Sequence, residues 1–255
     1  MIRTFRVFII DDLPKMTQVQ AEDRLRRARL SNFARSAQKP LARILSDLAK
    51  NLTDERIGDL ASRPHRWEMV LSGKWPARTL TVAVGPTPLF PVRVALWLRR
   101  SSPWLVVFEA SRGLADAAAR LVAGALCGDP SKIKPLVPGI PHWKALAEWV
   151  EGPGAESGAL LGGRFYHAMA GGTPVEWIAL RCAIGSDRAL VKESFQTATG
   201  IGELLFQTPP LESYRKSLIC RVSRLGVIRV YGEEISDAAI DAVILELEAL
   251  WGFLK

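Results

Sequence analysis

The feature that most constrains this 255-residue chain is the shortness of its apolar runs, which proline, glycine and charge interrupt throughout. Val92–Leu98 and Trp104–Phe108 are of strand length, whereas a membrane-spanning helix needs ~20 apolar residues. Strands that follow one another through short turns pair antiparallel. The sequence therefore predicts a mostly antiparallel sheet and no membrane partner.

Strand-sized segments fall into two groups bounded by turn-forming residues. A single strand is expected first, within residues 1–10. The first group then comprises Trp67–Leu71, Thr79–Val84, Val92–Leu98 and Trp104–Glu109. The second group comprises Phe165–Met169, Val175–Cys182, Leu190–Phe195, Glu203–Gln207, Ser217–Val222 and Val227–Tyr231.

Helical periodicity is clearest from Thr17 to about Lys50, with a break expected at Pro40. Its apolar stripe comprises Leu30, Phe33, Ala34, Ala37, Leu41, Ile44, Leu45 and Leu48. A further helical turn is predicted over Asp54–Ala61, and later helices over Gly113–Leu126, His142–Val150 and Asp237–Trp251. Ser236 is the expected N-cap of the last helix.

These patterns predict an α+β fold, mostly antiparallel sheet with helices on one face. Four segments are expected: a strand and basic amphipathic helical arm (1–62), a first strands-plus-helix half (63–130), a Pro/Gly-rich connection with a short helix (131–163) and a second strands-plus-helix half (164–255). The two halves share an element order, and residues 114–118 align with residues 235–239. We interpret this order as a pseudo-twofold duplication of a helix–strands–helix unit; the alternative is one irregular α+β domain.

Charge is unevenly distributed along the chain, whose formal net charge is +8. Residues 1–50 contain 11 Lys and Arg against 5 Asp and Glu, a net charge of +6, and the other 205 residues contribute +2. A basic segment of this kind is typical of proteins that bind polyanions, although a solvated basic helix gives the same composition. We hypothesise a nucleic-acid partner, either DNA or RNA.

Two sets of residues are the candidate nucleic-acid contacts. The first consists of arginines of the N-terminal arm: Arg24, Arg26, Arg27, Arg29 and Arg35. The second lies at a predicted hairpin tip, where Arg99 and Arg100 are positioned to neutralise phosphates and Trp104 to stack on an unpaired base. The alternative for the second set is a core tryptophan beside a solvated turn.

Motifs for catalysis are missing from the sequence. The three histidines are far apart in the chain, no CxxC pair occurs among the three cysteines, and no phosphate-binding or dinucleotide-binding loop is complete. We therefore assign no catalytic, metal-binding or cofactor-binding residue, and disfavour an enzyme without excluding one. Scattered cysteines and the lack of a secretory signal favour a reducing, cytoplasmic location.

Three functions remain open at this point. The first is a nucleic-acid-associated protein that uses the arm and a sheet face. The second is a non-catalytic subunit or adaptor of a protein assembly, docking a protein partner through the amphipathic N-terminal helix. The third is an enzyme whose site is assembled from residues distant in sequence.

Overall fold

The computed structural model describes residues 1–58, 60–76, 89–152, 157–183 and 187–252. Within these ranges seven helices and twelve strands form an α+β fold, and the strand pairs are antiparallel. The chain divides into an N-terminal unit, Phe5–Pro135, and a C-terminal unit, which combines Met1–Thr4 with Leu136–Lys255. The predicted fold class, antiparallel sheet with helices packed on it, is confirmed.

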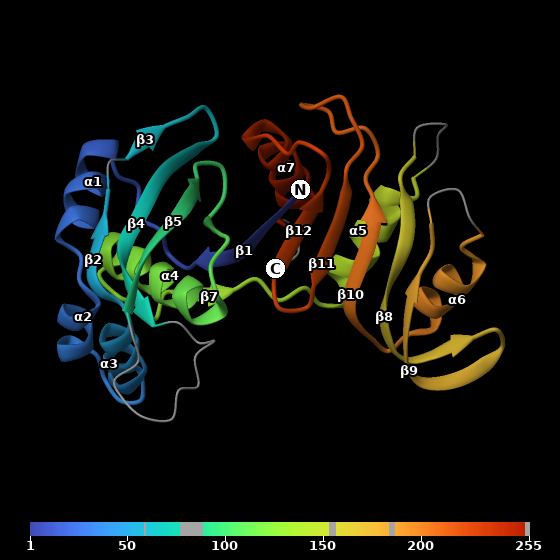
Figure 1. Cartoon of the computed structure of the whole chain (residues 1–255), viewed down its shortest axis with the longest axis horizontal. Helices are drawn as coiled ribbons and strands as arrows, with labels where there is room; N and C mark the ends of the chain where they lie inside the picture. Colours follow the sequence, from blue (N-terminus) through green and yellow to red (C-terminus); the bar gives the residue numbers. More distant parts are fainter. Residues whose placement is uncertain (59, 77–88, 153–156, 184–186, 253–255) are drawn as a thin grey trace. The chain divides into compact units, whose positions relative to one another are not determined.

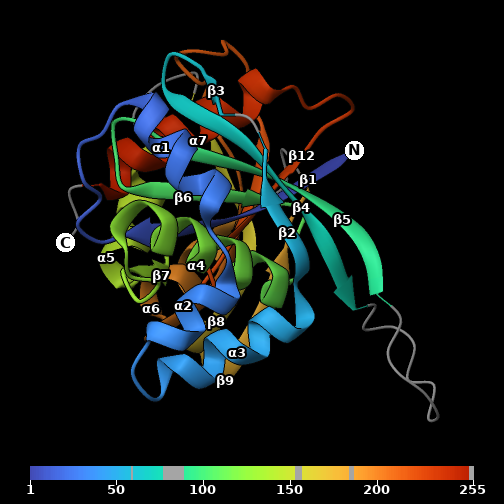
Figure 2. The ribbon, with the colours of Figure 1, turned by 90° about the vertical axis from the view of Figure 1, so that its left-hand side faces the viewer.

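The N-terminal unit has the strand order β2-β4-β5-β6-β1, with β3 paired to β4 and β7 to β1. Its helices lie on one side of β4 and β5 (Figure 2). The strands are β1 (Ile2–Ile10), β2 (Thr53–Ile57), β3 (Ala61–Ser62), β4 (Arg66–Pro76), β5 (Leu89–Arg99), β6 (Trp104–Phe108) and β7 (Ile133–Pro135). The helices are α1 (Gln18–Arg27), α2 (Leu30–Ser36), α3 (Leu41–Asn51) and α4 (Arg112–Cys127).

The helices of the predicted arm pack on the core of their own unit. Leu25, Leu30 and Leu45 are fully buried in one cluster with α4 and the inner face of the sheet. Phe33 of α2 approaches α4 so closely that a Cβ on Gly124 would lie 2.7 Å from its ring. The helical segment of residues 30–48 is therefore amphipathic as predicted, and most of its apolar stripe packs against the core of the N-terminal unit.

The structure of residues 28–62 differs from the sequence prediction at two places. The helical segment is interrupted near Pro40, between α2 and α3, as predicted. It is also interrupted at Ala28–Arg29, between α1 and α2, where no interruption was predicted. The predicted helical turn over Asp54–Ala61 is wrong, because β2 and β3 occupy it. Burial alternates with a period of two in β2, and the buried Glu55 carboxylate accepts the Leu30 backbone N–H at the start of α2. The predicted strand Thr79–Val84 lies outside the described residues.

The C-terminal unit has the strand order β9-β8-β10-β11-β12. In the view of Figure 1, α5 lies behind β8 and β10, so the other face of these strands is toward the viewer. The strands are β8 (Ala159–Ala170), β9 (Thr173–Arg181), β10 (Gly200–Gln207), β11 (Ile219–Ser223) and β12 (Val227–Tyr231). The helices are α5 (Ile140–Val150), α6 (Ala189–Thr197) and α7 (Asp237–Trp251).

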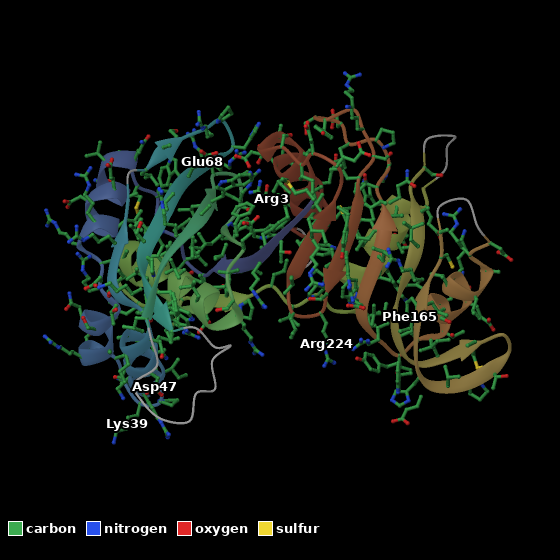
Figure 3. All side chains as sticks on the ribbon, in the orientation of Figure 1. Arg3, Lys39, Asp47, Glu68, Phe165 and Arg224 are labelled. Carbon is green, nitrogen blue, oxygen red and sulfur yellow. The ribbon has the colours of Figure 1, made fainter. Side chains whose placement is uncertain are left out.

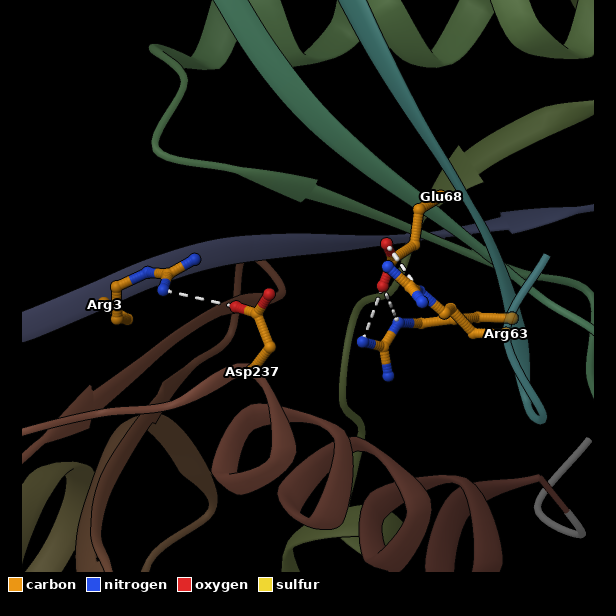
Figure 4. A network of polar contacts seen from close by, with 5 residues as sticks. Arg3, Arg63, Glu68 and Asp237 are labelled. Atoms are coloured by element: carbon orange, nitrogen blue, oxygen red, sulfur yellow. Dashed lines mark hydrogen bonds and ion pairs between the residues drawn. The ribbon is translucent and has the colours of Figure 1, made fainter. Parts of the chain in front are cut away.

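Two helices of this unit, α7 and α6, test the sequence prediction. Ser236 accepts the backbone N–H of Ala239 and caps α7 as predicted, and Arg3 forms an ion pair with Asp237 in its first turn (Figure 4). The prediction of a strand over Leu190–Phe195 is wrong. This segment is in α6, where Val191 and Ser194 are buried at helical spacing.

Both units contain a three-stranded meander followed by a helix, β4-β5-β6-α4 and β10-β11-β12-α7. The duplication itself remains a prediction. In the described part of the chain, no helix is long and apolar enough to span a membrane. All three cysteines are free thiols.

Candidate nucleic-acid interface

The arginines of α1 are exposed, and acids on the same helix accompany two of them. Arg26 forms an ion pair with Glu22 at 2.7 Å, and Arg27 forms one with Asp23 at 2.8 Å. Both pairs have i, i+4 spacing and contribute little to stability, because solvent screens them. Their carboxylates nevertheless reduce the positive potential that this helix presents to a polyanion.

The remaining arm arginines are divided between local contacts and solvent. Arg24 donates to the carbonyl oxygen of Leu126 at 2.8 Å, which satisfies a C-terminal carbonyl of α4. Arg29 donates to the carbonyl of Ala28 at 2.6 Å. Arg35 is exposed and has no hydrogen bond or ion pair to another described residue. The structure thus leaves Arg35 as the most available cation among the five predicted arm contacts.

The predicted hairpin tip exists, but it does not present its tryptophan or its first arginine to solvent. β5 and β6 pair antiparallel, with Leu98 opposite Leu105. Trp104 is 3% exposed and Arg99 is 2% exposed. The expectation that these two side chains face solvent is therefore wrong, because β6 is buried on both faces. Only Arg100 is exposed, and its backbone N–H donates to the His65 carbonyl.

Other arginines of this sheet are also occupied by neighbours. Arg66, opposite Arg99 in the register, forms an ion pair with Glu68 at 2.7 Å, and Arg63 approaches the same carboxylate at 3.2 Å (Figure 4). The guanidinium carbon of Arg66 lies 3.6 Å from the ring centroid of Trp97. This pairing of cation, acid and indole stabilises the sheet locally.

The sheet of the C-terminal unit has one face covered by helices. Phe206 of β10 contacts Trp149 of α5, with ring centroids 6.4 Å apart. Phe165 of β8, which is fully buried, contacts Phe195 of α6 at 6.5 Å. Because side chains alternate along a strand, the residues between these anchors lie on the opposite face.

The strand register identifies the residues that share this opposite face. Tyr166 pairs with Trp177, and Arg164 pairs with Glu203. Arg221 pairs with Arg229. We define the basic-aromatic face as these residues and their in-phase neighbours: Arg164 and Tyr166 on β8, Trp177 and Arg181 on β9, Glu203 on β10, Arg221 on β11, and Arg229 and Tyr231 on β12.

Two aromatic rings lie opposite each other at one edge of this face, on β8 and the edge strand β9. Trp177 is 60% exposed. The Tyr166 ring lies across the backbone of Gly202, where a Cβ would be 3.0 Å from its Cε2 atom. Arg224, which projects from the β11–β12 turn (Figure 3), has its guanidinium carbon 5.8 Å from the Tyr166 ring. The face therefore presents flat apolar surfaces next to cations.

Most cations on the face have no acidic partner. Arg164, Arg181 and Arg229 are exposed and form no hydrogen bond or ion pair with the described residues. Arg221 differs, because its Nε and Nη2 atoms both donate hydrogen bonds to the Glu203 carboxylate. This contact raises the pKa of Arg221 above its ordinary value. The unpaired guanidinium groups are suited to bind phosphate oxygens.

The β8–β9 hairpin that carries both rings is held by α6. Gly171 and Gly172 form its two-residue loop with φ of 58° and 74°, and both backbone N–H groups donate to the Glu193 carboxylate at 2.8 and 2.9 Å. The Met169 backbone N–H donates to Thr197 Oγ1 at 2.8 Å. These bonds fix the hairpin against its helix and so position Tyr166 and Trp177.

The unit also contains a cavity of about 450 Å³ between α5 and α6, on the side away from this face. Lys192 and Glu151 line it and form an ion pair at 3.2 Å. Across the described ranges, no three His, Cys, Asp or Glu side chains are grouped as metal ligands would be. The cavity combines charged and apolar walls without a nucleophile adjacent to a base.

Sequence reasoning missed the basic-aromatic face although a signal was present. Arg164 and Tyr166 are two residues apart, as are Arg229 and Tyr231. In a strand this spacing places both side chains on one face. Arginine that alternates with an aromatic residue along a strand indicates this face better than adjacent arginines at a turn.

No protein-family model matches the chain, and no curated protein matches it.

Proposed function

We propose that this protein binds nucleic acid, and that the basic-aromatic face of the C-terminal unit is the principal interface. The N-terminal arm adds a weaker, nonspecific attraction through Arg35 and its neighbours. One observation supports the proposal most strongly: three exposed arginines, with no acidic partner among the described residues, share with two aromatic rings a sheet face that the unit's helices leave uncovered. Both DNA and RNA present the phosphates and bases that such a face contacts.

The chemistry of the proposal is electrostatic first. Each arginine that neutralises a phosphate releases condensed counterion, so the affinity falls as salt rises. Arg164, Arg181, Arg224 and Arg229 supply up to four such contacts. For a single strand, the log–log slope of affinity against salt is then about −3.

Fluorescence anisotropy with labelled DNA and RNA strands, between about 50 and 200 mM salt, tests this proposal. The triple variant Arg164→Gln, Arg181→Gln, Arg229→Gln is expected to make the slope shallower by about 2. The arm variant Arg24→Gln, Arg26→Gln, Arg27→Gln, Arg29→Gln, Arg35→Gln is expected to change it by less than ~1, because most of these cations already have partners in the structure. Arg93→Gln, which removes one exposed cation of β5, is a single-charge control outside both surfaces and is expected to leave the slope unchanged.

Two results contradict the proposal. Folded wild-type protein that binds no strand or duplex at about 50 mM salt, where the Debye length is ~14 Å, rules out electrostatic recognition of nucleic acid. That result favours the assembly-subunit hypothesis instead. A triple variant with the slope of the wild type removes the face from the interface.

A further inference from the structure

We infer that the basic-aromatic face selects unpaired nucleic acid, by stacking bases on Tyr166 and Trp177 while the surrounding arginines hold the phosphates. The inference rests on the proposed function and adds the class of ligand: a single strand rather than a duplex.

The two rings form one cross-strand pair. Tyr166 and Trp177 lie directly opposite each other on adjacent strands, which are ~4.8 Å apart. Trp177 leaves most of its side chain in water, at 60% exposure. Exposing an indole is unfavourable unless a partner covers it, and a nucleobase covers it well because every base has a π-face.

A base in a duplex has both faces covered by its neighbours, so stacking on a protein ring requires an unpaired or unstacked base. The width of the sheet points the same way. The five strands of the C-terminal unit, in the order β9, β8, β10, β11 and β12, span about four inter-strand spacings, or ~19 Å. The major groove of a duplex is ~12 Å wide and admits a helix or two strands.

The arginines lie where they can contact the phosphates of a nucleic-acid strand bound across the rings. Arg164 is two residues from Tyr166 on the same face of β8, Arg181 is four residues from Trp177 on β9, and Arg224 lies over Tyr166. The register places Arg164 and Arg181 toward the same end of the β8–β9 pair, with Arg224 beside Tyr166, so a nucleic-acid backbone that leaves the rings toward that end meets guanidinium groups. The hairpin is held by Glu193 before any ligand arrives, so little ordering is needed on binding.

The experiment compares three labelled ligands of about 15 nucleotides, a length within the site sizes of known single-strand platforms. They are a thymidine strand, the same backbone with abasic residues, and a matched duplex; a uridine strand extends the comparison to RNA. The wild type is expected to bind the thymidine strand ~5- to ~150-fold more tightly than the abasic strand, the range for one stacked base.

Variants then locate the stacking ring. Trp177→Ala is expected to lose most of the preference for the thymidine strand over the abasic strand, because Trp177 is the more exposed of the two rings, and to bind the abasic strand unchanged. Trp177→Phe is expected to restore most of the preference. Phe90→Ala, which removes an aromatic side chain that is 46% exposed in the N-terminal unit, is the matched control. Circular dichroism confirms that each variant is folded.

The outcomes separate the two proposals. Equal binding of thymidine strand, abasic strand and duplex, with no effect of Trp177→Ala, overturns the stacking inference and leaves electrostatic nucleic-acid binding in place. Tighter binding of the duplex than of either strand also overturns the inference. Absence of binding to all ligands overturns the proposed function and this inference with it.

Discussion

The N-terminal arm and the basic-aromatic face are both rich in arginine, yet the structure uses their arginines differently. In α1, Arg26 and Arg27 lie beside Glu22 and Asp23, and Arg24 caps a carbonyl of α4. On the C-terminal face, Arg164 and Arg229 have no acidic partner among the described residues. Most of the net charge is in the arm, whereas the unpaired cations gather on the face. Net charge per segment is therefore a poor guide to where a polyanion binds.

Removing a core side chain beneath the basic-aromatic face is expected to have the largest effect. Phe206→Ala deletes a fully buried ring that contacts Trp149, and is expected to cost ~3–5 kcal/mol of unfolding free energy. Urea unfolding measures the cost. Leu45→Ala, at a fully buried position beneath the arm, is the matched change and is expected to cost ~2–5 kcal/mol. A loss below ~1 kcal/mol for Phe206→Ala shows that the ring is not a core anchor.

Removing an acidic partner from each surface distinguishes the two surfaces by the cation that becomes available. Glu203→Gln removes the carboxylate that Arg221 binds, whereas Asp23→Asn removes the one that Arg27 binds in the arm. Glu203→Gln is expected to strengthen binding and to steepen the single-strand salt slope by about 0.7, because one more guanidinium reaches phosphate. Asp23→Asn is expected to change it less. An arm variant that gains more than the face variant reverses the ranking proposed for the two surfaces.

The smallest predicted effect concerns the stability of the C-terminal unit as pH changes. His142 Nδ1 accepts the Gly139 backbone N–H at 3.2 Å, and burial lowers the pKa of His142 below its ordinary value of 6.5. The unfolded chain therefore takes up the proton first as pH falls, so stability is lost on acidification through pH ~6.5 and is unaffected above it.

The urea midpoint measured at several pH values checks this sign. His142→Gln keeps a group able to accept the Gly139 N–H but does not titrate, so its midpoint should vary less between pH ~7.5 and ~5.5 than that of the wild type. A variant with the same pH dependence as the wild type shows that other groups are responsible.

Much of the fold follows from the sequence where pattern and length agree. The closing helix has a serine cap and a long apolar stripe, so Asp237–Trp251 was predicted with the observed bounds. Two short segments failed because their local pattern was ambiguous. Asp54–Ala61 forms strands because it pairs with β4, and Leu190–Phe195 forms a helix because it packs on β8. In both cases the tertiary partner decides, and a single sequence does not display it.

The candidate site was less predictable than the fold. Arg99 and Trp104 flank the predicted turn, but both side chains are buried, Arg99 at the end of β5 and Trp104 at the start of β6. The basic-aromatic face is assembled from the five strands β8 to β12, and the register of β8 with β9 brings Tyr166 next to Trp177. Alternation within each strand was visible in the sequence, whereas the order of the strands was not.

The position of a bound nucleic-acid strand on the protein distinguishes the two surfaces directly. Photochemical crosslinking of a 4-thiouridine strand, followed by mass spectrometry of the crosslinked peptides, reports which side chains the bases touch. The account predicts crosslinks on peptides that contain Tyr166, Trp177 and Tyr231, and a loss of the Trp177 crosslink when unlabelled strand competes. Crosslinks confined to peptides of α1 to α3, with none on β8 or β9, contradict it and make the arm the interface.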